Sequence, residues 1–433
     1  MNKIFYKLKL FFSSWLLRLG VQLDNPLLGL WSLLLLTVNF NRQSPIKVLC
    51  LGRSVFLDDI EAMLEFSGKI HYQMIRLSHF QIIFNQCRGG DRSTDLTEAS
   101  YHTTNIAQAV KERYYCYLKK LVPLLHRRLG FQALLSGNFG YIVQQELARV
   151  FGELGLPVIV LHKEGVAMTN DMEIDMKVIA NNRFIGSKIL FYNDLVRELA
   201  INTPSIGVSR ENSAVVGIPR LDYYLKKKAV NDKNQIVFFA FYPEHRFALY
   251  NDQEKVRNKI LQRSEEFYKI VMDFAQRHPE IRVIIKTKSA QYYLDYVYDI
   301  MHKYFKKDLP NIEITNSGRI ERLIFESKAV IGYNSTVLME ALLAGKIIFT
   351  PYFGDLITDR EWDYFAAYPE LVNYVKSLSG LEEYFFQAEK YKNYDFKRKE
   401  EYLSQHLPLP FGQASAKAED LIIETIKSKQ YGN

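Results

Sequence analysis

Short apolar runs alternate with longer amphipathic segments along most of the chain. Runs of strand length stand at 46–52, 70–77, 131–135, 157–161, 185–191 and 214–217, and in the second half at 236–241, 282–285, 311–315, 328–333 and 346–350. Segments with helical spacing separate them, and the longest are 100–129, 141–154 and 254–278. Strands that alternate with helices are typical of parallel sheets. The pattern therefore predicts an α/β chain with two Rossmann-like sheets.

The length of 433 residues suits two domains better than one. A lysine run at 226–228 and the polar segment 231–234 form a credible linker between the two sets of strands. We expect an N-terminal domain at 41–230 and a C-terminal domain at 231–433. The segment 358–430 is expected to be mostly helical.

The first forty residues are the most apolar part of the chain. Basic residues are interleaved there with aromatic and aliphatic ones: Lys3, Phe5, Lys7, Lys9, Phe11, Phe12, Trp15, Leu16, Leu17 and Arg18. This pattern favours helices that lie on a membrane surface. The uncharged run 27–38 is too short to cross a hydrocarbon core of about 30 Å. The alternative is that these helices pack on the N-terminal domain, and both arrangements are compatible with each other.

The formal net charge of +8 indicates an anionic partner, such as a nucleotide sugar, an anionic lipid headgroup or a nucleic acid. No nucleic-acid-binding motif is present, so we expect no nucleic acid. The scattered cysteines Cys50, Cys87 and Cys116 form no metal pattern and indicate a reducing cytoplasm. No D-x-D motif stands in a convincing turn. We therefore expect metal-independent chemistry without a cofactor.

The stretch 328–354 carries the clearest candidate site. An apolar strand ends at Tyr333, and Asn334, Ser335 and Thr336, all good helix N-caps, precede an apolar helix that Gly345 ends. In an open α/β sheet, ligands bind at the carboxyl ends of strands. Free N–H groups and the helix dipole at such a place suit a diphosphate. An ordinary strand-helix unit with a capped helix is the alternative.

This stretch resembles the donor-site signature of GT-B-fold glycosyltransferases of bacterial surface polysaccharide synthesis, and that of the related CDP-glycerol glycerophosphotransferases. The G-x-N-S-T-x-x-x-E-A-like pattern is matched by Gly332, Asn334, Ser335, Thr336, Glu340 and Ala341. The resemblance implies a GT-B fold, in which two Rossmann-like domains face a cleft and the second binds the donor. It also implies that Tyr333 lies at the donor and that Glu340 accepts a hydrogen bond from a ribose or sugar hydroxyl. Sugar-nucleotide 2-epimerases share a similar turn.

Other donor contacts are expected from the strand ends that precede this motif. Lys286 and Lys288 flank the end of one strand, where many relatives have Lys-x-His-Pro; Lys288 and Ser289 stand here in place of His-Pro. A lysine can still neutralise a diphosphate, although two solvated lysines are the alternative. His245 and Arg246 follow the first strand of the second domain and are further candidates.

In the N-terminal domain, two polar turns follow strands: 136–138 (SGN) and 162–165 (HKEG). Sugar transfer with inversion needs a base for the acceptor hydroxyl, and Glu164 is the first candidate, with His162 next. Related transferases carry an acidic-Gly base motif in this loop, which Glu164 and Gly165 match. A solvated Lys–Glu pair is the alternative. Arg53, Asn138 and Lys163 are expected to line the acceptor side. The segment 217–222 (GIPRLD) is similar to one that precedes the interdomain linker in these families.

These observations predict a glycosyltransferase that moves a sugar from a nucleotide-activated donor to a surface polysaccharide or lipid-linked acceptor. We expect it to be cytoplasmic and peripheral at the inner face of the cytoplasmic membrane. Two alternatives stay open: a CDP-alditol phosphotransferase of the same fold, and a catalytically silent GT-B-like binding subunit, which the missing His-Pro favours. Donor sugar, acceptor and stereochemical outcome are left open because the fold does not fix them.

Overall fold

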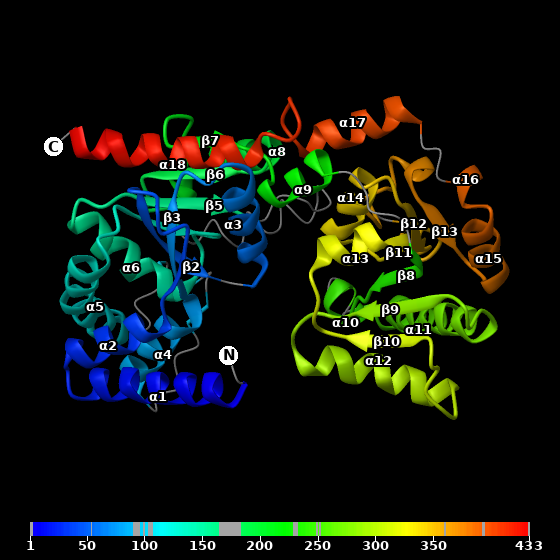
Figure 1. Cartoon of the computed structure of the whole chain (residues 1–433), viewed down its shortest axis with the longest axis horizontal. Coiled ribbons are helices and arrows are strands. Elements are labelled where there is room, and N and C mark those ends of the chain that lie inside the picture. Colours follow the sequence, from blue (N-terminus) through cyan, green and yellow to red (C-terminus); the bar gives the residue numbers. More distant parts are fainter. Residues whose placement is uncertain are drawn as a thin grey trace. The chain divides into compact units, whose positions relative to one another are not determined.

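The computed structural model describes residues 3–52, 54–89, 96–97, 100–102, 107–163, 183–227, 233–247, 250, 253–358, 361–391 and 395–431, without the side chains of 3–7, 54–55, 245–246 and 430–431. The chain divides into two compact units (Figure 1). Unit 1 contains the N-terminal part of the chain up to Asp222 and resumes at His406, and unit 2 contains Tyr223–Gln405. Each unit has its own sheet, so the prediction of two α/β sheets is confirmed.

Among the described residues, the sheet of unit 1 has seven strands in the order β1-β3-β2-β4-β5-β6-β7. The strands are β1 (Val38–Phe40), β2 (Lys47–Gly52), β3 (His71–Arg76), β4 (Ala133–Ser136), β5 (Val158–His162), β6 (Lys188–Phe191) and β7 (Ser213–Val215). All pairs are parallel except β1 with β3. The strand order reverses between β2 and β4, which places the topological switch point of this sheet at their carboxyl ends.

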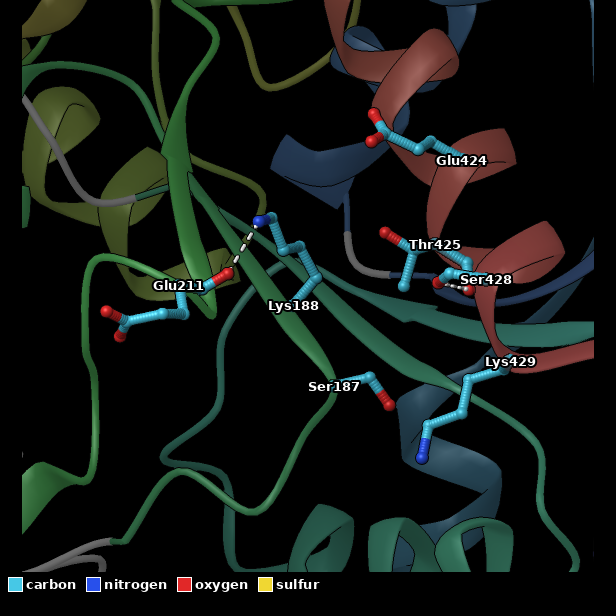
Figure 2. Close-up of a pocket in the computed structure, with 7 residues that line it drawn as sticks. All are labelled: Ser187, Lys188, Glu211, Glu424, Thr425, Ser428 and Lys429. Carbon is cyan, nitrogen blue, oxygen red and sulfur yellow. Dashed lines mark hydrogen bonds between the residues drawn. The ribbon is translucent and has the colours of Figure 1, made fainter. Parts of the chain in front are cut away.

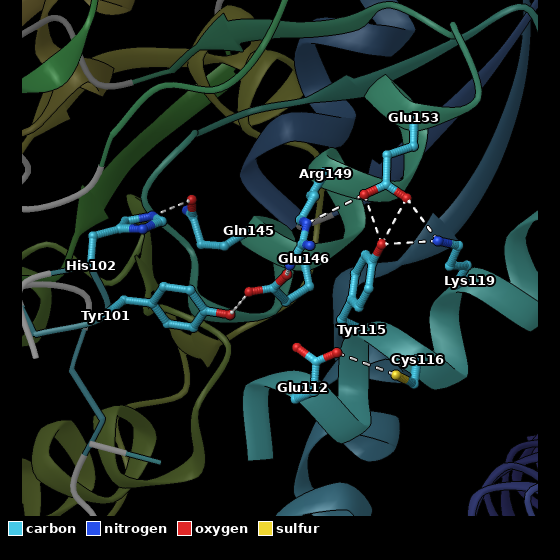
Figure 3. Close-up of polar contacts among 10 residues, drawn as sticks. All are labelled: Tyr101, His102, Glu112, Tyr115, Cys116, Lys119, Gln145, Glu146, Arg149 and Glu153. Atoms are coloured by element: carbon cyan, nitrogen blue, oxygen red, sulfur yellow. Dashed lines mark hydrogen bonds and ion pairs between the residues drawn. The ribbon is translucent and has the colours of Figure 1, made fainter. Parts of the chain in front are cut away.

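Helices α3 (Ser54–Phe66), α4 (Leu77–Arg88), α5 (Gln108–Leu129), α6 (Ile142–Glu153) and α8 (Asp194–Ile201) belong to unit 1, with short 3₁₀ turns η1 (Pro204–Ile206) and η2 (Pro219–Leu221). The predicted helix 100–129 begins only at Gln108, because Ala107 adopts a left-handed conformation with a φ of 55°. Helix α5 packs on α6 through a polar network (Figure 3). In it, the Tyr115 hydroxyl donates to Glu153 at 2.7 and 2.8 Å, and the Arg149 guanidinium lies 3.8 Å from the Tyr115 ring centre.

The N-terminal segment forms two helices, α1 (Lys3–Gln22) and α2 (Pro26–Leu36), which lie side by side (Figure 1). The Asn25 side chain caps α2 by accepting from the Leu27 amide at 3.0 Å, and Ser32 Oγ donates to the Ser13 carbonyl at 2.7 Å. Helix α1 packs on α4, and α2 packs on α5. Residues 38–40, which we expected to continue this helical segment, instead form β1, because extended Val38–Phe40 pairs with β3.

No helix in the described part of the chain is long and apolar enough to cross a membrane.

The last helix, α18 (Ala414–Tyr431), packs against α3 and η2 of unit 1. Asp222 Oδ2 accepts from the Ser415 amide at 2.8 Å, at the first turn of α18. A side chain at Gly217, whose φ is 88°, would come within 3.1 Å of Ala414 Cβ. Arg220 forms a buried ion pair with Asp59 of α3 at 3.2 Å. The 217–222 segment, which includes η2, therefore contacts both α3 and α18 and joins them.

Unit 2 has a parallel sheet of six strands among the described residues, in the order β10-β9-β8-β11-β12-β13. The strands are β8 (Lys233–Phe239), β9 (Arg282–Lys286), β10 (Ile312–Thr315), β11 (Ser327–Ile331), β12 (Ile347–Pro351) and β13 (Asn373–Val375). This is the doubly wound order in which the first and fourth strands are central neighbours. The switch point therefore lies between the carboxyl ends of β8 and β11, where Ile331 is in register with Phe238.

The helices of unit 2 are α9 (Asp222–Lys226), α10 (Pro243–Arg246), α11 (Glu254–Arg277), α12 (Gln291–Tyr304), α13 (Ile320–Glu326), α14 (Thr336–Leu343), α15 (Leu378–Phe386), α16 (Ala388–Tyr391) and α17 (Phe396–His406), with the 3₁₀ turn η4 (Pro369–Leu371). The first residue of α9 is the last residue of unit 1 before the chain enters unit 2. An aromatic core lies beneath the switch point. Phe241 of the turn after β8 contacts Tyr268 and Tyr333, with ring centres 5.6 and 5.4 Å apart. Aromatic side chains thus pack against one another next to the carboxyl ends of β8 and β11.

Candidate functional site

The turn from β11 into α14 is held close to the neighbouring strand β8. Gly332 is buried, and a Cβ there would lie 3.0 Å from Leu338 Cδ2 and 3.9 Å from the Phe239 carbonyl oxygen. The Gly332 amide donates to the Phe349 carbonyl of β12 at 3.2 Å. Glycine is needed here because the turn passes between the helix and two strands. It brings the start of α14 directly to the switch point.

Asn334 adopts a left-handed conformation with a φ of 42°, which is strained for most residues but tolerated by asparagine. Its Nδ2 donates to the Trp362 carbonyl at 3.2 Å, and its Oδ1 accepts from the Tyr364 amide at 3.1 Å. These two hydrogen bonds attach the turn to the segment 361–366. Asn334 therefore fixes the direction in which the chain enters α14.

Ser335 occupies the N-cap position of α14 with an extended backbone. Within the described part of the chain, its hydroxyl makes no capping hydrogen bond. Ser335 and Thr336 are both half-buried. The first amides of a helix lack intrahelical acceptors, and the dipole makes this end positive. Two hydroxyls next to such a helix end form a suitable environment for a phosphate oxygen.

Tyr333 and Glu340, also predicted at the donor, are directed into unit 2. The Tyr333 ring is 1% exposed, packs on Phe353 with ring centres 4.9 Å apart, and its hydroxyl donates to the Trp362 carbonyl. Glu340 is 3% exposed, and its Oε2 accepts from the Tyr224 hydroxyl at 2.8 Å. Both side chains thus contact other residues of unit 2 in this structure.

The carboxyl end of β8 lies beside this turn in the sheet, and that of β9 lies one strand further out. The Ala240 amide, after β8, donates to the Lys286 carbonyl at 2.9 Å. Lys286 Nζ donates to the carbonyls of Thr287 and Asn316, at 2.9 and 3.0 Å. Lys288 is exposed, and its ammonium lies 5.6 Å from the centre of the Tyr293 ring. The backbone of α10 places 245–246 after β8, while the side chains of His245 and Arg246 lie outside the described part of the structure.

A group that the sequence did not indicate is Asp363. It is 4% exposed and lies between Trp362 and Tyr364, the residues that hold Asn334. Its Oδ1 accepts from the Phe365 amide at 2.8 Å and from the Tyr374 hydroxyl at 3.3 Å. Its Oδ2 has no hydrogen-bond partner among the described residues. Burial raises the pKa of Asp363 to about 7. The only signal in the sequence was Trp362, one of three tryptophans, in the aromatic stretch 361–365 (EWDYF).

In unit 1, the predicted acceptor residues follow the neighbouring strands β4 and β5. Asn138 is buried, and its Oδ1 accepts from the Gly140 amide at 2.8 Å. The Lys163 amide donates to the Gly137 carbonyl at 3.0 Å, which joins the two turns. His162 is fully buried between Phe139 and Phe191, with ring centres 5.6 and 5.5 Å away. Arg53 and Glu164 lie outside the described residues.

Two cavities lie apart from these turns. One of 380 Å³ in unit 1 opens at the amino end of β6, between Ser187 and Lys188 on the strand side and α18 (Figure 2). There Lys188 Nζ donates to the Glu211 carbonyl at 2.9 Å. The other, of 440 Å³ in unit 2, lies at the carboxyl ends of β12 and β13, where Arg263 of α11 pairs with Asp355. The predicted site residues are not among the residues that line either cavity.

Among the described residues, no group of three or more His, Cys, Asp or Glu side chains is arranged to hold a metal ion.

Comparison with known proteins identifies the fold of this chain. No family model and no curated protein sequence matches the chain. Among solved structures, the chain is similar to a protein described as a UDP-N-acetylglucosamine 2-epimerase of Listeria monocytogenes, with 10% identity and a TM-score of 0.51 over 90% of this chain and 97% of that one. A second UDP-N-acetylglucosamine 2-epimerase gives 11% identity and a TM-score of 0.51 over 88% and 96%. The chain thus has the two-domain parallel-sheet fold of GT-B proteins.

Proposed function

We propose that this protein is a metal-independent glycosyltransferase of the GT-B type that uses a nucleotide sugar as donor. The observation that carries the proposal is the arrangement at the switch point of unit 2. There the turn Gly332–Thr336 lies beside the carboxyl end of β8, and the amino end of α14 carries two half-buried hydroxyls. The two solved structures compared above are described as enzymes of UDP-N-acetylglucosamine, which supports a nucleotide sugar as the ligand.

In this proposal the donor diphosphate lies at the amino end of α14. The hydroxyls of Ser335 and Thr336 and the first amides of the helix donate to its oxygens, and Lys286 and Lys288 contribute positive charge. Tyr333 and Asn334 act through the turn, because their hydrogen bonds to Trp362 and Tyr364 keep α14 in place. His245 and Arg246 are further donor contacts in the proposal.

The chemical step forms a bond between the acceptor oxygen and the anomeric carbon and breaks the bond from that carbon to the phosphate oxygen. Glu164 takes the proton of the acceptor hydroxyl, and the nucleotide leaves with the bonding electrons. Stabilisation of its charge by the helix end and the lysines lowers the barrier. Arg53, Asn138 and Lys163 hold the acceptor, which we propose is a surface polysaccharide or a lipid-linked glycan at the inner face of the cytoplasmic membrane.

The test is a set of incubations with UDP-sugars, CMP-sugars and CDP-glycerol, each with and without lipid-linked glycan acceptors, followed by mass spectrometry of nucleotide and glycan. Acceptor-dependent release of nucleotide, together with a glycan heavier by one sugar, is the expected result. Arrival of glycerol phosphate on the acceptor would instead establish the alditol phosphotransferase. Conversion of UDP-N-acetylglucosamine to its epimer without an acceptor would establish an epimerase. Binding of a donor without any turnover would establish a silent binding subunit.

A further inference from the structure

The side of α1 and α2 that faces away from α4 and α5 is covered with large apolar side chains. We call this surface the outer face; it consists of Leu8, Phe11, Phe12 and Trp15 of α1 and of Leu27, Trp31 and Leu35 of α2. Phe11 is 75% exposed, and Trp15 and Trp31 are 50% and 57% exposed. Large apolar patches of this kind on a folded protein mark interaction sites.

The periodicity of the two helices separates this face from the one that packs on unit 1. In α1, Leu8, Phe11, Phe12 and Trp15 follow the three- and four-residue spacing of one helix side. The other side is buried, with Leu17 fully inaccessible. In α2, Leu27, Trp31 and Leu35 are exposed at four-residue intervals, while Leu30 and Leu33 are buried. A helix that only covers unit 1 typically carries polar residues on its outer side, so this row of apolar side chains points to a further apolar contact.

The charges of this segment favour one kind of contact. Helix α1 carries Lys3, Lys7, Lys9 and Arg18 and no acidic residue, and α2 carries no charge. The acidic residue in the turn between them, Asp24, pairs with Lys120 of α5 at 2.5 Å. Basic residues beside aromatic and aliphatic ones are the composition of helices that lie in the plane of an anionic bilayer surface. Tryptophan is enriched at this interface.

We propose that the outer face docks on an anionic lipid bilayer, with α1 and α2 lying in the interface and their apolar side chains about 5–10 Å into the headgroup and acyl boundary. Docking on a bilayer deepens the proposed function, because a lipid-linked acceptor is held in such a bilayer. Docking rests on the proposed function only as far as that acceptor is concerned. Docking itself does not depend on catalysis. The two proposals are therefore tested separately.

The tryptophans give a direct measurement. The chain has three, Trp15 and Trp31 on the outer face and Trp362 in unit 2. The full chain is mixed with phosphatidylcholine vesicles that contain phosphatidylglycerol and a lipid brominated along its acyl chain. We expect co-flotation, and quenching of tryptophan fluorescence by the bromines. The variant Trp15→Phe with Trp31→Phe keeps apolar side chains, so it should still float while its quenching is lost.

Three further variants separate the causes. The triple variant Phe11→Ser, Trp15→Ser and Trp31→Ser is expected to weaken vesicle binding by about tenfold or more, since it removes three aromatic side chains that would be buried in the bilayer. Arg18→Glu is expected to weaken binding at low salt, with a smaller effect at high salt. Phe396→Ser is the matched control, because Phe396 is 78% exposed but outside the outer face; it should bind like the unchanged protein.

Several results would overturn the proposal. If the unchanged protein does not float with anionic vesicles, the outer face has another partner. If sedimentation without lipid gives a dimer that the three-serine variant converts to a monomer, while vesicles are not bound, that partner is a second copy of the chain. If alkaline carbonate and high salt both fail to release the protein, the segment is inserted rather than docked. Donor binding, measured by calorimetry without lipid, is expected to be unaffected in all these variants.

Discussion

Ser335 differs from the other polar residues of its turn in how its side chain is engaged. Tyr333 and Asn334 hydrogen-bond to Trp362, and Glu340 accepts from Tyr224, so their polar atoms hold the turn together. The Ser335 side chain makes no capping hydrogen bond in the described part of the chain. Residues that are not needed for the local structure are the ones whose replacement reports on a ligand.

Replacing Ser335 and Thr336 together by alanine is expected to weaken nucleotide binding by about tenfold or more, because two hydrogen bonds to a charged phosphate are lost. The free energy of unfolding should change by less than about 0.5 kcal/mol, since no cap is removed. Calorimetric titration and thermal unfolding check both. Ser377→Ala is the matched control: Ser377 caps α15 by accepting from the Gly380 amide at 3.2 Å, so its loss should cost about 1 kcal/mol and leave binding unchanged. If the double variant loses stability and keeps its affinity, the phosphate lies elsewhere.

Glu164→Gln keeps the shape of the side chain and removes the negative charge that accepts the proton. Turnover is expected to fall by about 100-fold or more, with donor affinity nearly unchanged because the proposed donor residues are in unit 2. Initial rates at saturating donor, together with titration of the donor, separate the two quantities. Near-normal turnover would remove Glu164 from the mechanism. His162 would then be the next residue to test, although its ring is fully buried beside Phe139 and Phe191.

At the scale of elements, the segment 361–366 links β13 to the turn before α14. Trp362 and Tyr364 contact Asn334, while Asp363 accepts from Tyr374 of β13 at 3.3 Å. Trp362 also packs against Tyr374, with ring centres 5.0 Å apart. A buried carboxyl group thus lies in the segment that holds the proposed donor turn, about thirty residues further along the chain.

Asp363 gives this link a pH dependence. Its usual pKa of 3.8 is raised by burial to about 7, so between these values the folded state holds a proton that the unfolded state releases. The free energy of unfolding therefore falls as the pH rises from about 4 through 7, by as much as about 4 kcal/mol at 1.36 kcal/mol per pKa unit. Asp363→Asn keeps the shape without titrating.

The measurement is chemical denaturation of both proteins at several pH values. The difference in unfolding free energy between Asp363→Asn and the unchanged protein is expected to grow in favour of the variant as the pH rises from 5 to 8. Tyr374→Phe is the control, because it removes one hydrogen bond to Asp363 and leaves the carboxyl group in place. A difference that is constant over this range would show that Asp363 does not titrate near neutral pH.

At the scale of the whole molecule, unit 1 is closed by a helix from the far end of the chain. Glu419 of α18 is fully buried, and it accepts from the Tyr72 hydroxyl at 2.8 Å and from the Lys69 amide at 2.7 Å. Burial raises the pKa of Glu419. The chain leaves unit 1 after Asp222, and the segment from His406 onwards, which contains α18, belongs to unit 1 again.

Glu419→Gln is expected to destabilise unit 1 by about 1–3 kcal/mol, because an amide NH₂ group replaces one of two acceptors in a buried site. Asp420→Asn is the neighbouring control, since Asp420 is 60% exposed and its pairing with Lys69 contributes little. Hydrogen exchange of unit 1 and of unit 2, followed separately, gives the comparison. Equal effects of both substitutions, or an effect confined to unit 2, would contradict the assigned role of α18.

Much of the fold was predictable because its signals are local. Apolar runs of strand length such as 46–52 and 236–241, separated by amphipathic helices, led to two parallel sheets, and the turn at Gly332–Thr336 indicated the start of α14. Strand periodicity and cap residues depend on neighbours within a few positions, so they can be read without the tertiary structure. The pattern of basic, aromatic and aliphatic residues in the first forty positions likewise indicated that α1 and α2 carry apolar side chains available for a membrane surface.

Only the tertiary structure decided which of these residues contact one another. It placed Gly332–Thr336 next to β8, engaged Tyr333 and Asn334 with Trp362, buried Asp363, and joined Glu419 to Tyr72 across most of the chain. It also turned 38–40 into an edge strand through pairing with β3. Strand order, burial and the raised pKa of a carboxyl group are set by contacts between residues far apart in the chain. No local pattern contains that information, because propensity is overridden wherever such contacts form.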